Sequence, residues 1–265
     1  MRSGVGGRRR DAGPFSRAVE AAGMEIRGER ECTDCGERWS YYETGDVACP
    51  ACGSMQSVGV DEERALHTTT AGEFDLTEAR RAWEERPRDE AVDVVKAACR
   101  EFVRGNGFVH GGDLVELDGR RVAARELANA VDIVGRSQSL SDDEEYYFLE
   151  LLRGADAGDR PDAEDVPASM RAARGLATAD VVERYRRDAR DWLEATDHEL
   201  APAVNDVLSG LESHQKRTQA LQGDVSARDA DALYEAARDL THYLRDADED
   251  AVVRAAERLR GLAED

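Results

Sequence analysis

Four of the five cysteines in this chain fall into one short pattern, which constrains the fold more than any other feature. The pattern consists of two Cys-x-x-Cys pairs, each followed by a glycine. Two cysteines three positions apart on a tight turn can direct both sulfurs at one ion, and the glycine permits a left-handed backbone at the end of the turn. Two such pairs close together are typical of a tetrahedral four-thiolate metal site. The sequence therefore predicts four metal ligands, Cys32, Cys35, Cys49 and Cys52.

Residues 24–60, which contain both pairs, have the pattern of a zinc ribbon. Partial alternation predicts a short strand over 38–42 and a closing strand over 56–60. So few strands cannot bury a core unaided, whereas structural zinc supplies on the order of 10 kcal/mol of folding free energy. We expect Trp39 and Tyr41 to share one strand face, with Tyr42 on the other. These three aromatic residues are candidates for shielding the metal, docking on the rest of the chain and anchoring a partner.

The rest of the chain is predicted to be helical. Residues 61–74 are polar and lack periodicity, so we interpret them as a linker in which His67 is free of metal. From residue 75 onward, apolar residues recur at helical spacing. This spacing predicts an all-α helical domain over 75–200 and a C-terminal helical hairpin or bundle over 201–265. The fold class is therefore a small N-terminal β zinc ribbon followed by an all-α domain.

Three local features refine this helical prediction. Ser141 and Glu144 have the spacing of a capping box at the start of a helix. A short helix is expected over 170–174. Cys99 lies on the apolar stripe of a predicted helix, which indicates a small buried residue and not a reactive thiol.

The chain is strongly acidic, with a net charge of −21 from 57 acidic and 36 basic residues. Only two of the basic residues, Lys96 and Lys216, are lysines. This composition is typical of a halophilic protein kept in molar salt, where a Debye length of roughly 3 Å weakens acidic self-repulsion. No apolar run reaches the ~18 residues of a membrane span, and no secretory signal is evident. The paired thiols favour a reducing, cytoplasmic environment over a disulfide scaffold.

Residues 1–23 differ from the rest of the chain because they are rich in glycine and carry five arginines against Asp11 and Glu20. One interpretation is a disordered basic arm that touches nucleic acid. The interpretation that we favour is a start codon placed too far upstream, with Met24 as the true first residue.

The predicted ribbon is itself acidic, since residues 24–60 contain seven Asp and Glu residues and only three arginines, Arg27, Arg30 and Arg38. Binding to a phosphate backbone needs a positive group at each contact. Three arginines scattered among acids do not form such a track. We therefore expect the ribbon to bind protein, and nucleic acid is the less favoured partner.

The helical region carries no recognisable catalytic motif. It has neither a Gly-x-x-x-x-Gly-Lys phosphate loop nor a Gly-x-Ser-x-Gly elbow. None of the five histidines completes a Glu-x-x-His pair, which disfavours a di-iron bundle. A solvated acidic surface accounts for the many carboxylates. We therefore expect that the protein is not an enzyme.

The stretch from Met24 to Ser54, which includes both cysteine pairs, and the helical stretch 146–156 resemble a known family. It consists of uncharacterised haloarchaeal proteins with a transcription factor IIB-type zinc ribbon, and the likeness covers about residues 24–200. The resemblance implies that the four cysteines bind zinc, and it implies no activity. The two cysteine pairs are also similar to those of rubredoxin, in which four thiolates hold iron and carry electrons. Because no second redox centre is evident, we favour zinc over iron.

The sequence therefore predicts a non-enzymatic zinc-ribbon protein that acts as an interaction or adaptor module. Two alternatives stay open. One is a transcription-associated factor that contacts polymerase or nucleic acid, and the other is a rubredoxin-like iron electron carrier.

Overall fold

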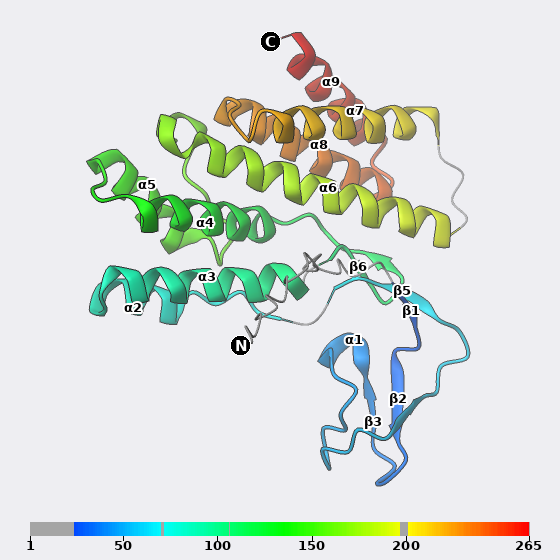
Figure 1. Cartoon of the computed structure of the whole chain (residues 1–265). Helices are drawn as coiled ribbons and strands as arrows, with labels where there is room; N and C mark the ends of the chain where they lie inside the picture. Colours follow the sequence, from blue (N-terminus) through cyan, green and yellow to red (C-terminus); the bar gives the residue numbers. More distant parts are fainter. Residues whose placement is uncertain (1–23, 70–71, 106, 197–200, 265) are drawn as a thin grey trace, which may run out of the picture.

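The computed structural model describes residues 24–69, 72–105, 107–196 and 201–264. Over these ranges, a small head built from short strands projects from one end of an elongated body of helices (Figure 1). The predicted fold class, a small N-terminal β ribbon followed by a helical domain, is confirmed. The expectations for residues 1–23 lie outside the described residues. No helix in the described part of the chain is long and apolar enough to cross a membrane.

The head contains two small antiparallel sheets and one helical turn. Its elements are β1 (Met24–Ile26), β2 (Glu29–Cys32), β3 (Arg38–Ser40), α1 (Tyr41–Thr44), β4 (Ser57–Gly59) and β5 (Ala65–His67). One sheet has the order β3-β2-β4, and the other pairs β1 with β5. The predicted strand over 38–42 is wrong in its second half, because β3 ends at Ser40 and the chain then turns through α1 to Gly45, which has a φ of 65°. Trp39 and Tyr41 therefore do not share a strand face.

The predicted linker over 61–74 is wrong at its centre, where the chain forms β5. This strand pairs with β1, so that Met24 lies opposite His67. Leu66 of β5 is 7% exposed and belongs to a hydrophobic core of the helical body. The segment therefore fastens the head to the body instead of spacing the two apart.

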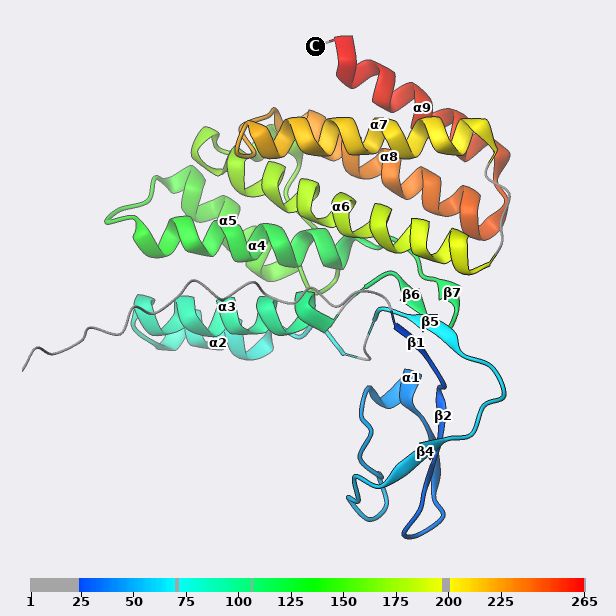
Figure 2. The same ribbon diagram turned by 45° about the vertical axis from the view of Figure 1, so that its right-hand side comes forward.

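The helices of the body lie in stacked rows, and one short hairpin lies beside the head (Figure 2). The elements are α2 (Thr77–Glu85), α3 (Arg88–Gly105), β6 (Val109–His110), β7 (Asp113–Leu114), α4 (Gly119–Arg136), α5 (Asp142–Gly154), α6 (Arg171–Ala195), α7 (Pro202–Ala220), α8 (Ala227–Asp246) and α9 (Glu249–Glu264). The capping box of α5 is confirmed, since the Ser141 side chain accepts from the Glu144 N–H and the Glu144 carboxylate accepts from the Ser141 N–H. The short helix predicted over 170–174 is wrong, because residues from 171 onward are the start of the long helix α6.

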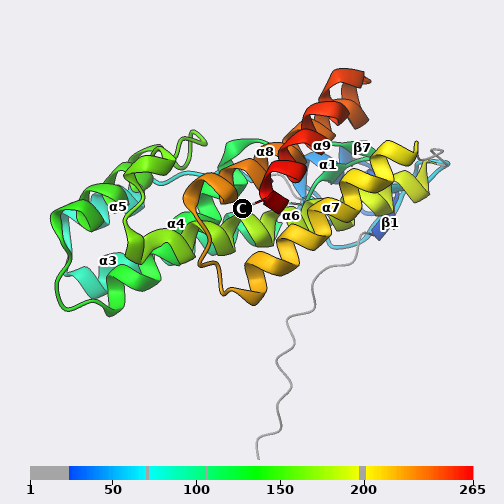
Figure 3. The same cartoon turned by 90° about the horizontal axis from the view of Figure 1, so that it is seen from above.

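Two hydrophobic cores fill the body, and α6 contributes to both. Helices α2 to α5 surround the first core, in which Cys99 is fully buried as predicted. The start of α6 packs there through Ala173, whereas residues from Ala177 onward pack in the second core with α7, α8 and α9. Helix α6 also runs alongside α7 (Figure 3). Residue 200 therefore does not mark the boundary of a separate core.

A buried charge network connects four helices of the body. The Glu126 carboxylate of α4 is fully buried and accepts from the Tyr147 hydroxyl of α5 and from Arg174 Nε of α6, the latter at 2.9 Å. Arg160 donates to the same carboxylate at 3.0 Å. Arg174 also pairs with Asp231 of α8 at 3.2 Å. Each buried charge faces an opposite charge, as burial of an ion requires, so the network holds the helices together.

A cluster of rings closes the junction between head and body. The ring of Tyr42 lies 4.9 Å from the ring of His67, and the Tyr42 hydroxyl donates to the Ile26 carbonyl at 2.9 Å. His67 is buried, and its Nδ1 accepts from the Gly111 N–H at 3.1 Å. His110 Nε2 lies 2.9 Å from the Tyr42 carbonyl oxygen. Residues from both parts of the chain thus pack in one cluster, which sets the orientation of the head.

We expect the free energy of unfolding to fall as the pH drops from about 6.5 to 4. Burial, together with the nearby ring of His110, lowers the pKa of His67 to about 4. The unfolded chain takes up this proton near pH 6.5, so the contribution of neutral His67 is present above that pH and is lost as the pH falls towards the folded pKa. The substitution His67→Asn removes the titrating group.

Urea unfolding of both proteins from pH 7 to pH 4 tests this expectation. The wild type should be more stable than the His67→Asn variant at pH 7, and this difference should shrink towards pH 4. A difference that stays constant over the whole range would contradict the assignment to His67.

Candidate metal centre

The two cysteine pairs lie on loops that share one hydrogen-bond pattern. The Gly36 N–H donates to the Cys32 carbonyl at 3.0 Å, and the Gly53 N–H donates to the Cys49 carbonyl at 2.8 Å. Both glycines have a left-handed backbone, with φ of 77° and 72°. A side chain is disfavoured in that conformation. The predicted role of the two glycines in closing the turns is therefore confirmed.

The four sulfur atoms lie within 4.8 Å of one another. The Sγ atoms of Cys32 and Cys52 are 3.7 Å apart, and those of Cys35 and Cys49 are 3.5 Å apart. A tetrahedral ion with bonds of ~2.3 Å to sulfur holds its ligands roughly 3.8 Å apart. A disulfide requires ~2.05 Å, and all four cysteines are free. The separations therefore fit one shared metal ion.

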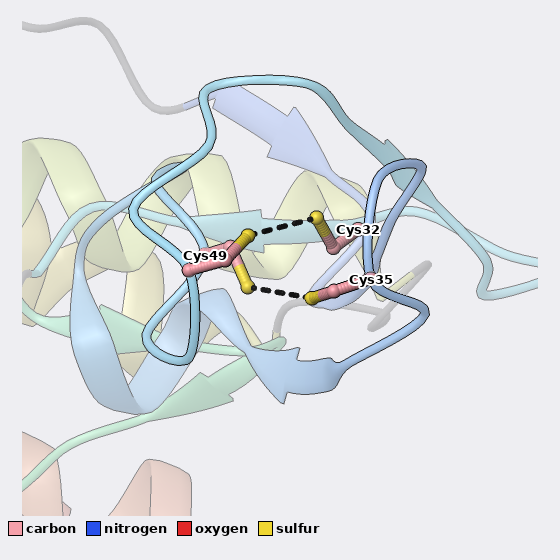
Figure 4. Close-up of side chains that lie close together, drawn as sticks. Cys32, Cys35 and Cys49 are labelled. Carbon is pink, nitrogen blue, oxygen red and sulfur yellow. Dashed lines mark hydrogen bonds between the residues drawn. The ribbon is translucent and has the colours of Figure 1, made fainter.

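The side chains reach the site from opposite loops. Figure 4 shows Cys32 and Cys35 on one loop, with their sulfurs turned towards the loop that carries Cys49. The Ser54 hydroxyl of the second loop also donates to the Asp34 carboxylate of the first. The structure thus brings together the four residues that the spacing singled out, and it fixes the two loops against each other.

The pKa values of the thiols differ within the cluster. The backbone N–H of Cys35, the largest influence on Cys32, helps to lower the pKa of Cys32 to about 7. At Cys35 the N–H of Glu37 lowers the pKa, but the thiols of Cys52 and Cys49 raise it, and the result is about 12. Metal binding needs deprotonated thiolates. A divalent cation would supply the positive charge that lets all four sulfurs lose their protons together.

Trp39 covers the inner side of the cluster. It is 7% exposed and packs with Cys32 and Cys49, which are also buried. Its indole N–H donates to the Asp46 carbonyl at 3.0 Å. Among the roles considered for Trp39, shielding of the metal fits this position, and little of its ring is left for a partner. The second cysteine of each pair is exposed, so the ion would lie near the surface of the head.

The sequence did not indicate a hollow of about 420 Å³ on the head. Arg27, Arg30 and Arg64 line it together with Tyr41 and Glu25. Arg27 and Arg30 are three positions apart, whereas Arg64 is distant in the sequence and lies in the segment predicted to be a linker. The pairing of β1 with β5 brings them to one place, which only the register of these strands could have indicated. Tyr41 therefore lines the hollow, whereas the adjacent Tyr42 packs in the junction between head and body.

The family match covers most of the chain. A family of unknown function, DUF7117, matches residues 24–259. The chain belongs to the DUF7117 family. No solved structure matches it. The match therefore spans both the head, with its cysteine cluster, and the helical body.

For this DUF7117 protein we expect one metal ion per chain, and we expect that ion to be zinc. The substitution Cys49→Ser removes one of four thiolates and should release the metal and unfold the head. Most helical signal should persist, because neither core of the body contains a metal-ligand cysteine. Elemental analysis and circular dichroism of the freshly reduced proteins measure both effects.

The substitution Cys99→Ser is the matched control, because Cys99 is a buried thiol of α3 outside the cluster. This variant should keep its metal. Full metal content in the Cys49→Ser protein, or none in the wild type, would contradict the assignment. Iron at full occupancy would instead favour the electron-carrier alternative.

Proposed function

We propose that the chain is a non-enzymatic, zinc-stabilised interaction protein whose head binds an acidic segment of a partner protein. The donor set supports the structural role of the ion. Four thiolates complete a tetrahedron, whereas catalytic zinc sites keep one position open for water or substrate. The hollow beside Tyr41 is the observation that carries the interaction role, because it is a recess on the rigidly mounted head.

The charge of the hollow supports an acidic partner. Its lining includes three arginines and one carboxylate, that of Glu25, so the local charge is +2. The side chains of Arg27 and Arg64 are exposed and have no ion pair in the described part of the chain. Arg30 is held in place by Ser57, whose hydroxyl accepts from Arg30 Nε at 3.0 Å. Two arginines are thus available for carboxylates, and a third is already oriented.

The surroundings of the hollow favour protein over nucleic acid. Beyond it, the ribbon surface carries the carboxylates of Glu29, Glu37 and Glu43, which are exposed. A phosphate backbone that continued past the hollow would meet these charges, and each contact needs a positive group. Arg38 does not help, because its Nε donates to the Glu31 carboxylate at 2.6 Å. A short acidic peptide needs only the hollow itself.

Exposed apolar side chains next to the hollow add contact area for a peptide. Val58 is 50% exposed and Val60 is 39% exposed, and they flank Gly59, which lines the hollow. Tyr41 contributes a half-buried ring. Aromatic residues and arginines dominate the energy of protein interfaces. We therefore assign the anchoring role to Tyr41 among the three aromatic candidates.

The test measures binding of the full chain to a short fluorescent peptide of alternating glutamate and valine. We expect saturable binding that the double substitution Arg27→Glu and Arg64→Glu weakens by about tenfold, because two exposed ion pairs of up to ~1 kcal/mol each are lost and 1.4 kcal/mol is a factor of ten. A double variant with Arg38→Glu and Arg81→Glu has the same net charge and should bind like the wild type.

Two results would contradict this proposal. One is equal weakening by both double variants, which would show that only net charge matters. The other is saturable binding of single-stranded RNA or duplex DNA that is stronger than binding of the peptide and is lost in the Arg27→Glu, Arg64→Glu protein. That outcome would instead support the transcription-associated alternative.

A further inference from the structure

A second group of arginines surrounds a small hollow inside the helical body, away from the head. The hollow lies between α3, α4 and α6 and measures about 20 Å³. Its lining includes Arg121, Arg125 and Arg184, together with the ring of Phe108 and the carboxylate of Asp180. A space of ≳ 10–15 Å³ holds one water-sized particle. The hollow therefore accommodates one small ion or one water and no larger ligand.

Arg121 is the most constrained residue of this group. Its side chain is 11% exposed, and its Cζ lies 4.8 Å from the centroid of the Phe108 ring. One terminal nitrogen donates to the Glu116 carbonyl at 3.3 Å, and the other donates to the Gly107 carbonyl at 3.1 Å. The remaining nitrogen, Nε, is buried, and its N–H has no hydrogen-bond partner among the residues that the structure describes. A buried donor without a partner indicates a site for a bound water or ion.

The charge balance decides between those two occupants. Arg125 and Arg184 are half-buried and have no ion pair in the described part of the chain. Arg121 pairs with Asp118 at 3.5 Å. The three guanidinium groups of the hollow therefore face two carboxylates, those of Asp180 and Asp118, which leaves a local charge of +1. Burial lowers the pKa of Arg121; the charge of Asp118 opposes this shift, and the charges of Arg120 and Arg184 add to it. Water does not compensate such a charge, whereas an anion does.

We propose that this hollow binds a small monovalent anion of the halide class, such as chloride. The Arg121 Nε–H is the hydrogen-bond donor, and Arg125 and Arg184 supply the remaining positive charge. Asp180 and Asp118 offset two of the three positive charges and leave one, which a monovalent anion balances. The volume excludes phosphate and sulfate, which are several atoms across. The anion would join α4 to α6 at a point where the hydrophobic core is interrupted by charged side chains.

Thermal unfolding of the full chain in potassium chloride and in potassium gluconate, at equal concentration, tests this proposal. Binding to the folded state alone raises the melting temperature, and we expect chloride to raise it by about 3 °C. In separate Arg125→Gln and Arg184→Gln proteins this difference between the salts should shrink. The Arg100→Gln protein is the control, because Arg100 is exposed on α3 and has no described ion pair, and its difference should equal that of the wild type.

Crystals soaked in potassium bromide give an independent measurement that does not depend on a variant. An anomalous peak beside Arg121 Nε is the expected result. The absence of a peak there, or a salt difference that is the same in all three variants and the wild type, would show that the hollow holds water and would overturn the proposal.

Discussion

The four cysteine sulfur atoms of the head lie within 4.8 Å of one another, and the head is built around this cluster. As thiolates, they would repel one another without a cation between them. Among the described residues of the head, the buried hydrophobic cluster consists of Trp39 with Cys32 and Cys49, so this core is also the wall of the candidate metal site. Two sheets of two and three short strands bury too little apolar surface to be stable alone. An ion held by the four thiolates would therefore take the place of a hydrophobic core.

The helical body sets the orientation of the head. Leu66 of β5 enters the second core, and the rings of Tyr42 and His67 pack at the same junction. The β6–β7 hairpin is fixed in turn, because the Trp192 indole of α6 donates to the Gly112 carbonyl at 2.9 Å. A partner segment bound in the hollow lined by Arg27, Arg30 and Arg64 would thus lie close to the body. The pairing of β1 with β5 positions this hollow, and β5 also packs in the second core through Leu66.

The features that the sequence predicts are those set by neighbouring residues. The cysteine pairs and their glycines occupy a single turn each, and the capping box of α5 spans four residues, so spacing alone identifies them. Spacing alone does not identify strand β5, because it consists of three residues whose partners in β1 lie about 40 positions away. The prediction of a separate short helix over 170–174 is wrong for a related reason. Residues 171–174 continue into the long helix α6, whose later residues pack in the other core. The hollow lined by Arg27, Arg30 and Arg64 depends on the same long-range pairing of β1 with β5.

Long-range packing determines how charge is distributed over the molecule. A chain with a charge of −21 carries two hollows in which arginines outnumber carboxylates, and a buried network in which they balance. Arginine suits all three places, because its planar guanidinium is more weakly hydrated than an ammonium group and remains charged when buried. The acidic surface repels anions at a distance, but this repulsion extends over only ~8 Å at physiological ionic strength and ~3 Å at 1 M. As salt rises, the contact between a carboxylate and an arginine hollow is screened less than the surrounding repulsion. An acidic chain of this kind can therefore select anionic groups at short range without attracting polyanions to its surface.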